Sequence, residues 1–194
     1  LTQEQFQLAR KQATVLLKEF PNSFILYNIC GLIYNGLHHF DAAIKAYTKA
    51  LAIKPDYANA NSNMGNILKD QGKLENALEF YRKAVAIETS NAATFNNMGI
   101  TLEHLGRVEE AIVVYNKALT INSNFAEAHC NLGNAYKAVS RLNEAEGSYR
   151  KAIALKPDLA EIHKNLGNTL QDLNRFDEAE TSFSQAIALK PNIS

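Results

Sequence analysis

The chain has 194 residues, 46 % of them hydrophobic, and its 20 basic and 20 acidic residues cancel to zero net charge. Balanced charge removes the usual electrostatic argument for nucleic acid or an anionic membrane as a partner. No apolar run approaches the ~20 residues that cross a bilayer and no signal peptide opens the chain, so we expect no membrane insertion and a cytoplasmic location.

Residues 1–21 read as half a repeat. Thr2 and Gln5 have the spacing of a capping box, and Pro21 closes the amphipathic helix that follows. Five full units follow, at residues 22–57, 58–91, 92–125, 126–159 and 160–194. The last residues, 191–194, resemble the opening of another unit. We therefore expect a piece of a longer protein, or a chain whose ends meet other copies.

Four sets of residues recur with a period of 34 residues. The glycines are Gly31, Gly65, Gly99, Gly133 and Gly167. The alanines are Ala43, Ala77, Ala111, Ala145 and Ala179, and then Ala50, Ala84, Ala118, Ala152 and Ala186. Between them stand Tyr47, Tyr81, Tyr115, Tyr149 and Phe183. Such a fixed period predicts a stack of helical hairpins in which each unit buries its apolar face against its neighbours.

A glycine within a helix costs roughly 1 kcal/mol relative to alanine, so we expect close packing at each one. The second helix of the unit should approach there, with the aromatic side chain filling the gap. The turns between paired helices hold Gly72, Gly106, Ser140 and Asn174, with His38 in the first unit. Glycine and asparagine suit the left-handed conformation that ends a helix, serine suits it less and histidine least. Thr89 and Ser123 replace the proline that closes the other units, and longer second helices are expected there.

The Leu-Gly, Ala, aromatic, Ala, Pro pattern resembles the tetratricopeptide repeat over the whole chain. The resemblance implies an all-α, right-handed superhelical solenoid of antiparallel helix pairs, with five repeats and an N-terminal half-repeat helix. It also implies that the first helices line an inner groove, and that the chain is a scaffold for protein–protein interaction.

Groups that could do chemistry are scattered along the chain. His129 and His163 hold equivalent places in adjacent repeats, roughly 10 Å apart and too far for one zinc ion. Tyr27, Asn61 and Phe95 share that place, which favours packing. Cys30 and Cys130 lie three repeats apart, too distant for a disulfide. We therefore expect no enzyme activity within these residues, no cofactor and no metal.

Asparagine is the residue type that stands out, because helix interiors disfavour it by roughly half a kcal/mol. The recurring amides are Asn63, Asn97, Asn131 and Asn165, followed one turn later by Asn66, Asn134 and Asn168. By the tetratricopeptide resemblance they form a ladder in the groove, where a carboxamide can donate to and accept from an extended peptide. The alternative is that they bond only water or a neighbouring repeat.

The strings Asn-Met-Gly-Asn and Asn-Leu-Gly-Asn are similar to the asparagine-rich repeats of O-linked N-acetylglucosamine transferase and its bacterial relatives. That likeness implies a substrate-recruiting arm, with a catalytic domain elsewhere. Ile29 and Leu32 interrupt the pattern in repeat one, so the ladder should begin at Asn63. Lys164 and Asn168 fit only part of the carboxylate clamp of chaperone-binding relatives, which disfavours chaperone tails as partners.

Both signs of charge are expected along the groove, from Lys69, Glu103, Lys137, Asp70 and Asp172, with Gln171 beside them. This mixture favours a neutral or mixed-charge peptide. On the second helices Phe80, Val113 and Val114 stand where other repeats carry polar residues. We expect these three to face outward, where they are candidates for self-association into a homo-oligomer.

Overall fold

The structure, a computed structural model, describes residues 2–189, and all regular structure in that range is α-helical. The chain forms two compact units, residues 1–90 and 91–194. The first unit holds α1 (Gln3–Glu19), α2 (Phe24–Gly36), α3 (Phe40–Ile53), α4 (Ala58–Asp70) and α5 (Leu74–Ile87). The second holds α6 (Ala92–His104), α7 (Val108–Ile121), α8 (Ala126–Ala138), α9 (Leu142–Leu155), α10 (Ala160–Asp172) and α11 (Phe176–Leu189).

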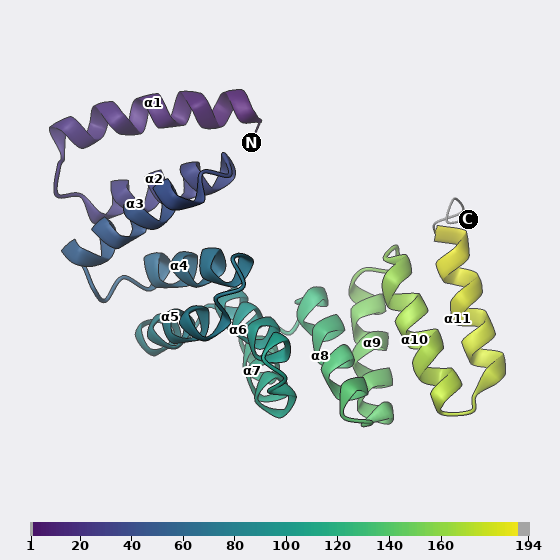
Figure 1. The fold of residues 1–194 in the computed structure, drawn as a ribbon. Coiled ribbons are helices and arrows are strands. Elements are labelled where there is room, and N and C mark those ends of the chain that lie inside the picture. The colour runs from purple at the N-terminus through teal and green to yellow at the C-terminus, as the bar shows by residue number, and fades with distance from the viewer. Residues whose placement is uncertain (1, 190–194) are drawn as a thin grey trace. The chain divides into compact units, whose positions relative to one another are not determined.

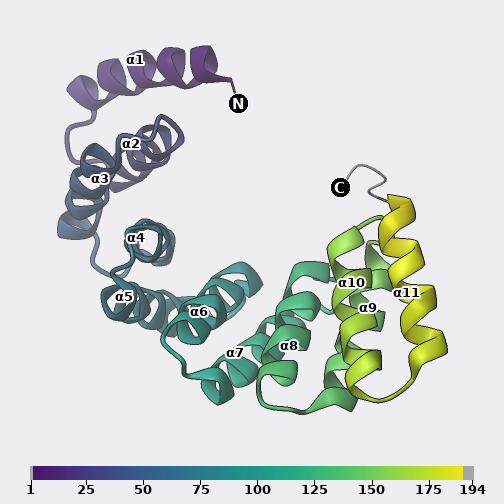
Figure 2. The same ribbon diagram turned by 45° about the vertical axis from the view of Figure 1, so that its right-hand side comes forward.

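Each repeat is a helical hairpin, which confirms the predicted all-α class. In Figures 1 and 2 every first helix lies beside the second helix of its own repeat: α2 with α3, α4 with α5, and so on to α10 with α11. None of the helices in the described part is long and apolar enough to cross a bilayer. Residues 191–194, which we expected to open another repeat, lie outside the described residues.

The N-terminal half-repeat begins with the predicted capping box. Thr2 Oγ1 accepts from the backbone N–H of Gln5 at 3.3 Å, and Gln5 Oε1 accepts from the backbone N–H of Thr2 at 2.8 Å. The helix then packs through Ala13 against Cys30 and other buried residues of α2 and α3. Cys30 is therefore a core residue, and both cysteines are free.

The recurring glycines are required by the tyrosine rings of their own repeats. A Cβ on Gly31 would lie 2.2 Å from the Tyr47 ring, and one on Gly133 would lie 2.6 Å from the Tyr149 ring. The expected close packing at the glycines is confirmed, although the contact is made by a ring and not by the backbone of the second helix. At Gly167 the ring belongs to Phe183.

The residue that ends the turn within each hairpin is left-handed in all five repeats. The φ angle is 72° at Gly72 and 73° at Gly106, but it is also 59° at His38, 60° at Ser140 and 60° at Asn174. The geometry of the hairpin thus imposes this conformation even on histidine, for which the left-handed region is strained.

The second helices all end at the same place in the repeat, so the expectation of longer helices before Thr89 and Ser123 was wrong. α5 ends at Ile87 and α7 at Ile121, just as α3 ends at Ile53. In each case the next residue leaves the helical conformation while its N–H still bonds an alanine carbonyl. The chain must turn there to place the following first helix, whether or not a proline follows.

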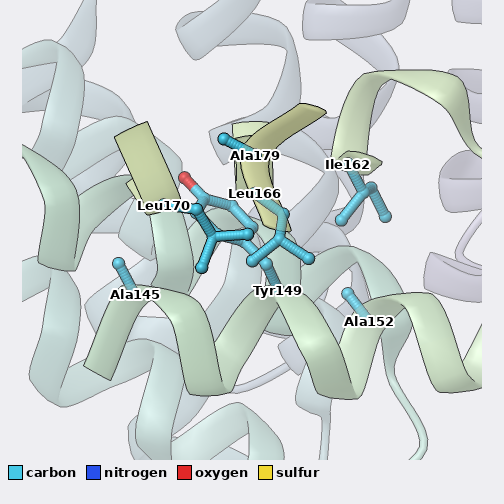
Figure 3. Close-up of a cluster of buried hydrophobic side chains, with 7 residues drawn as sticks. All are labelled: Ala145, Tyr149, Ala152, Ile162, Leu166, Leu170 and Ala179. Carbon is cyan, nitrogen blue, oxygen red and sulfur yellow. The ribbon is translucent and has the colours of Figure 1, made fainter. Parts of the chain in front are cut away.

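The interior of the second unit is built from small and large residues that alternate between helices. Figure 3 shows Tyr149 lying between Leu166 and Leu170 of α10, with Ala145 and Ala152 along α9. The alanines leave room for neighbouring helices to approach, while the tyrosine and leucines fill the space between them. This packing fixes which faces of α8 and α10 remain open for binding.

Candidate functional site

The predicted groove amides lie on the first helices, on the side that does not pack into the hairpin core. We call this surface, within each unit, the first-helix face. Asn63, Asn66, Asn97, Asn131, Asn165 and Asn168 are half-buried, and Asn134 is exposed. Ile29 and Leu32 hold the equivalent places on α2 and are 39 % and 45 % exposed, so the face of α2 is apolar.

Asn63 and Asn131 each use the nitrogen of the side-chain amide in a hydrogen bond within the protein. Asn63 Nδ2 donates to Asn28 Oδ1 on the preceding repeat at 3.0 Å, and Asn131 Nδ2 donates to Asn96 Oδ1 in the same way at 3.0 Å. Asn28 and Asn96 are buried. These bonds join consecutive first helices, as expected if the amides bond a neighbouring repeat, but no described residue bonds the carboxamide oxygen of Asn63 or Asn131.

On α4 and α8 the second amide of the repeat accepts a hydrogen bond from a buried tyrosine. Tyr81 donates to Asn66 Oδ1 at 2.7 Å, and Tyr149 donates to Asn134 Oδ1 at 2.7 Å. Asn134 Oδ1 accepts a further bond from Asn165 Nδ2 at 3.2 Å. With its oxygen satisfied twice, Asn134 has only its Nδ2 donor left for a guest.

Asn165 differs from Asn131 because Cys130 stands where Asn28 and Asn96 stand in other repeats. A thiol is a poor acceptor, so Asn165 bonds Asn134 instead. Burial, with the nearby carboxylates of Glu161, Glu127 and Glu103, raises the pKa of Cys130 to about 11. Acidic groups therefore surround the thiol in the second unit.

Three predicted site residues line one hollow of about 370 Å³ in the second unit: Asn134, Lys137 and Asn165. Lys137 Nζ is paired with Asp172 at 3.1 Å, and in the first unit Lys69 Nζ is paired with Asp70 at 3.4 Å. Both predicted groove lysines are thus neutralised by neighbours. Two amides line the hollow together with Lys137, Ala138 and Tyr149, and it has little net charge because Lys137 is paired.

Glu103 shows how the tyrosine is satisfied when the amide is missing. Ile100 replaces the second amide on α6, and Tyr115 donates to Glu103 instead. Burial raises the pKa of the Glu103 carboxyl, and the hydrogen bond from Tyr115 opposes this only in part. In the first repeat Leu32 holds the same place, and the Tyr47 hydroxyl has no partner among the described residues.

Two of the three residues predicted for self-association can be reached from solvent. Val113 is 56 % exposed and Phe80 is half-buried, but Val114 is only 7 % exposed. Val114 falls on the same helical face as Ala111, Tyr115 and the rest of the buried stripe of α7. The placement of Val114 on the outer surface was therefore wrong.

His129 and His163 each form a hydrogen bond to a loop, whereas the sequence predicted only a packing role for them. His129 Nε2 lies 3.0 Å from the carbonyl of Ser123, and His163 Nε2 lies 2.9 Å from that of Pro157. Asn61 Nδ2 makes the same bond to Pro55 at 3.2 Å. The shared position in the 34-residue period could have shown that a polar side chain there fastens the preceding loop in the second, fourth and fifth repeats. No cluster of three or more metal-ligating side chains occurs among the described residues.

Comparison with known families agrees with the hairpin geometry. The profile described as TPR repeat matches residues 31–71, 65–106 and 104–140, and the profile described as Tetratricopeptide repeat matches residues 126–159 and 160–193. The chain belongs to the tetratricopeptide repeat (TPR) family. The last two matched ranges start at the same residues as the fourth and fifth predicted repeats.

Several solved structures are similar over most of the chain. A MamA structure is 25 % identical with a TM-score of 0.79, covering 83 % of this chain and 94 % of its own. YrrB, described as a TPR protein with an unusual peptide-binding site, is 22 % identical with a TM-score of 0.82, covering 95 % of each chain. The pilF protein of Pseudomonas aeruginosa is 24 % identical with a TM-score of 0.75, covering 91 % of this chain and 78 % of its own. Among curated proteins, none matches the sequence.

Proposed function

We propose that this TPR chain is a protein-interaction scaffold that binds an extended protein segment on its first-helix faces through side-chain amides. The observation that carries the proposal is the pairing of leftover groups on α8. Among the described residues nothing bonds the oxygen of Asn131 or the Nδ2 of Asn134, and the two side chains lie one helical turn apart. One acceptor and one donor match the N–H and C=O of a peptide backbone.

The internal bonds of these amides favour the proposal over a purely structural role. A carboxamide held by a neighbour on one side is already oriented, so little side-chain entropy is lost when a guest bonds the other side. The hollow beside Asn134 and Asn165 gives such a guest space in the second unit. The peptide-binding site named for YrrB shows that a chain of this fold can bind peptides.

Groove variants must be chosen so that they do not remove a structural bond. Asn134→Ala would take the partner from buried Tyr149, and Asn131→Ala would do the same to buried Asn96. Asn168 is the most suitable position, because the aromatic residue of its repeat is Phe183, which has no hydroxyl to donate, and no hydrogen bond to its carboxamide occurs among the described residues.

The test begins with peptides selected from a random library on the immobilised chain, with affinities measured by fluorescence anisotropy. Asn168→Ala should weaken them several-fold, as expected for one lost hydrogen bond of about 1 kcal/mol, without changing the melting temperature. The control is Asn143→Ala, an exposed amide on α9. Methylation of the peptide's backbone nitrogens should abolish binding. If methylated and unmethylated peptides bind equally well, backbone recognition by amides is wrong.

The narrower likeness to the repeats of O-linked N-acetylglucosamine transferase stays a prediction, in which the same face would recruit substrates for a catalytic domain. Self-association also stays a prediction, now reduced to Phe80 and Val113. The same holds for the absence of catalysis within these residues, for the cytoplasmic location, and for one continuous solenoid.

A further inference from the structure

The face formed by the second helices carries a recess that repeats along the chain. Within the first unit one recess lies between α3 and α5 and is lined by Thr48, Leu51, Asn61, Met64 and Lys83. Within the second unit one lies between α7 and α9. The residues 68 positions later line it: Asn116, Leu119, His129, Leu132 and Lys151.

A third recess, between α1 and α3, has the same construction. Its lining includes Thr14, Leu17, Tyr27, Cys30 and Lys49, each 34 residues before its counterpart between α3 and α5. The volumes are about 270, 420 and 490 Å³. Small-molecule pockets hold roughly 300–1,000 Å³, so these recesses are small or at the lower end. That size suits single side chains of a protein partner better than a cofactor.

The charge of the recesses has one sign. Lys49, Lys83 and Lys151 each line a recess, Lys45 also lines the one between α1 and α3, and no Asp or Glu lines any of the three in the described part of the chain. None of these lysines has an ion-pair partner among the described residues, whereas Lys69 and Lys137 on the first helices both do. A repeated positive charge without a counter-charge is complementary to a carboxylate.

The lining of the recesses does not favour a polyanion such as nucleic acid. Each recess has a leucine wall and a single lysine of the repeating set, and the chain as a whole carries no net charge. Nucleic-acid binding depends on several phosphates being neutralised together, which this arrangement does not supply. His129 adds an unsatisfied polar atom to the lining of the recess between α7 and α9, because its Nδ1 has no partner among the described residues.

We propose that, within each unit, the recesses between second helices bind an acidic protein segment, on a surface separate from the first-helix face. Apolar side chains of that segment enter the recesses against the leucines. Its aspartates and glutamates pair with Lys49 and Lys83 on the first unit, and a segment on the second unit pairs in the same way with Lys151. Each unit would then hold protein segments of two kinds, a neutral one on its first-helix face and an acidic one on its second helices.

The probe is a fluorescein-labelled peptide in which leucine alternates with glutamate, and its counterpart in which lysine replaces glutamate. Fluorescence anisotropy measures both against the intact chain. The test variant is Lys49→Glu with Lys83→Glu and Lys151→Glu. The control reverses the same number of charges elsewhere, with Lys11→Glu, Lys73→Glu and Lys164→Glu, all exposed positions. Circular dichroism confirms that both variants keep their helices.

The acidic peptide should bind and the basic one should not, and the recess variant should weaken binding at least tenfold. Single exposed ion pairs contribute little, so the three reversals are made together. The control variant should stay within about twofold, and Asn168→Ala should have no effect, which separates this surface from the first-helix faces. Equal losses in both charge variants would overturn the proposal, as would displacement by a single-stranded oligonucleotide. The absence of binding up to about 1 mM peptide would overturn it as well.

Discussion

The tyrosine of each hairpin provides a test of how the hydrogen bonds of the repeat contribute to stability. Tyr47 and Tyr149 hold equivalent places and are 0 % and 1 % exposed. Tyr149 donates to Asn134 at 2.7 Å, while the Tyr47 hydroxyl has no partner among the described residues. Burial raises the pKa of Tyr47 well above its usual value, so the hydroxyl stays neutral at all ordinary pH values. The same substitution, tyrosine to phenylalanine, should therefore have opposite effects at the two sites.

Removing the Tyr149 hydroxyl should lower the free energy of unfolding by about 0.5–1.5 kcal/mol, the net worth of one hydrogen bond. Removing the Tyr47 hydroxyl should leave it unchanged or raise it, because an unpaired buried hydroxyl costs about 1–3 kcal/mol. The two variants should thus differ by roughly 2 kcal/mol. Ring packing is the same in both, since phenylalanine keeps the ring against the glycine.

Urea unfolding followed by circular dichroism gives the sign of each change, and amide hydrogen exchange assigns it to α2–α3 or α8–α9. Local exchange is needed because repeats unfold partly independently. A further variant, Leu32→Asn, places beside Tyr47 the amide that Tyr149 already has. It should stabilise the intact chain by about 1 kcal/mol and have no such effect when combined with Tyr47→Phe. If Tyr47→Phe destabilises the chain as much as Tyr149→Phe, the hydrogen-bond reasoning is refuted.

Four further substitutions test the hairpin. Gly133→Ala would put a Cβ 2.6 Å from the Tyr149 ring and should destabilise the chain by about 1–2 kcal/mol in urea unfolding. Gly147→Ala adds a Cβ that meets nothing within 4 Å, so it should stabilise the chain by about 0.5–1 kcal/mol in the same assay. His38→Gly should raise the urea midpoint by the equivalent of about 0.5–1 kcal/mol, because glycine adopts a φ of 59° without strain; a lower midpoint contradicts this. Burial raises the pKa of Glu103, so its contribution to the free energy of unfolding is full below the ordinary glutamate pKa and is lost as pH rises through the raised value. Glu103→Gln should remove this decline in stability. Identical profiles of stability against pH for the two proteins would refute the reasoning.

The sequence predicted which helices carry the candidate amides but not how those amides are hydrogen-bonded. The period placed Asn63, Asn131 and Asn134 on the first helices, because equivalent positions in identical hairpins must share a face. It could not say which atoms remain for a guest. That depends on whether the preceding repeat offers an acceptor such as Asn28, a thiol such as Cys130, or nothing.

Helix ends and burial depended on contacts between helices in the same way. Val114 looks exposed when its position is compared with the polar residues of other repeats, yet it lies on the buried stripe of α7. Proline marks the closing turn in some repeats only, while the second helix ends at the same place in α3, α5, α7 and α9. In each case the packing partner sets the outcome, and the partner cannot be read from the segment itself.

The sequence by itself determined the number of hairpins, their length, the residues of their turns and the family, because a 34-residue period constrains every unit in the same way. Only the tertiary structure decided how each polar group is used. A carboxamide has both a donor and an acceptor, and whether either is free depends on atoms one repeat away. The recesses between second helices likewise exist only where neighbouring hairpins meet, and among the described residues no carboxylate lines them.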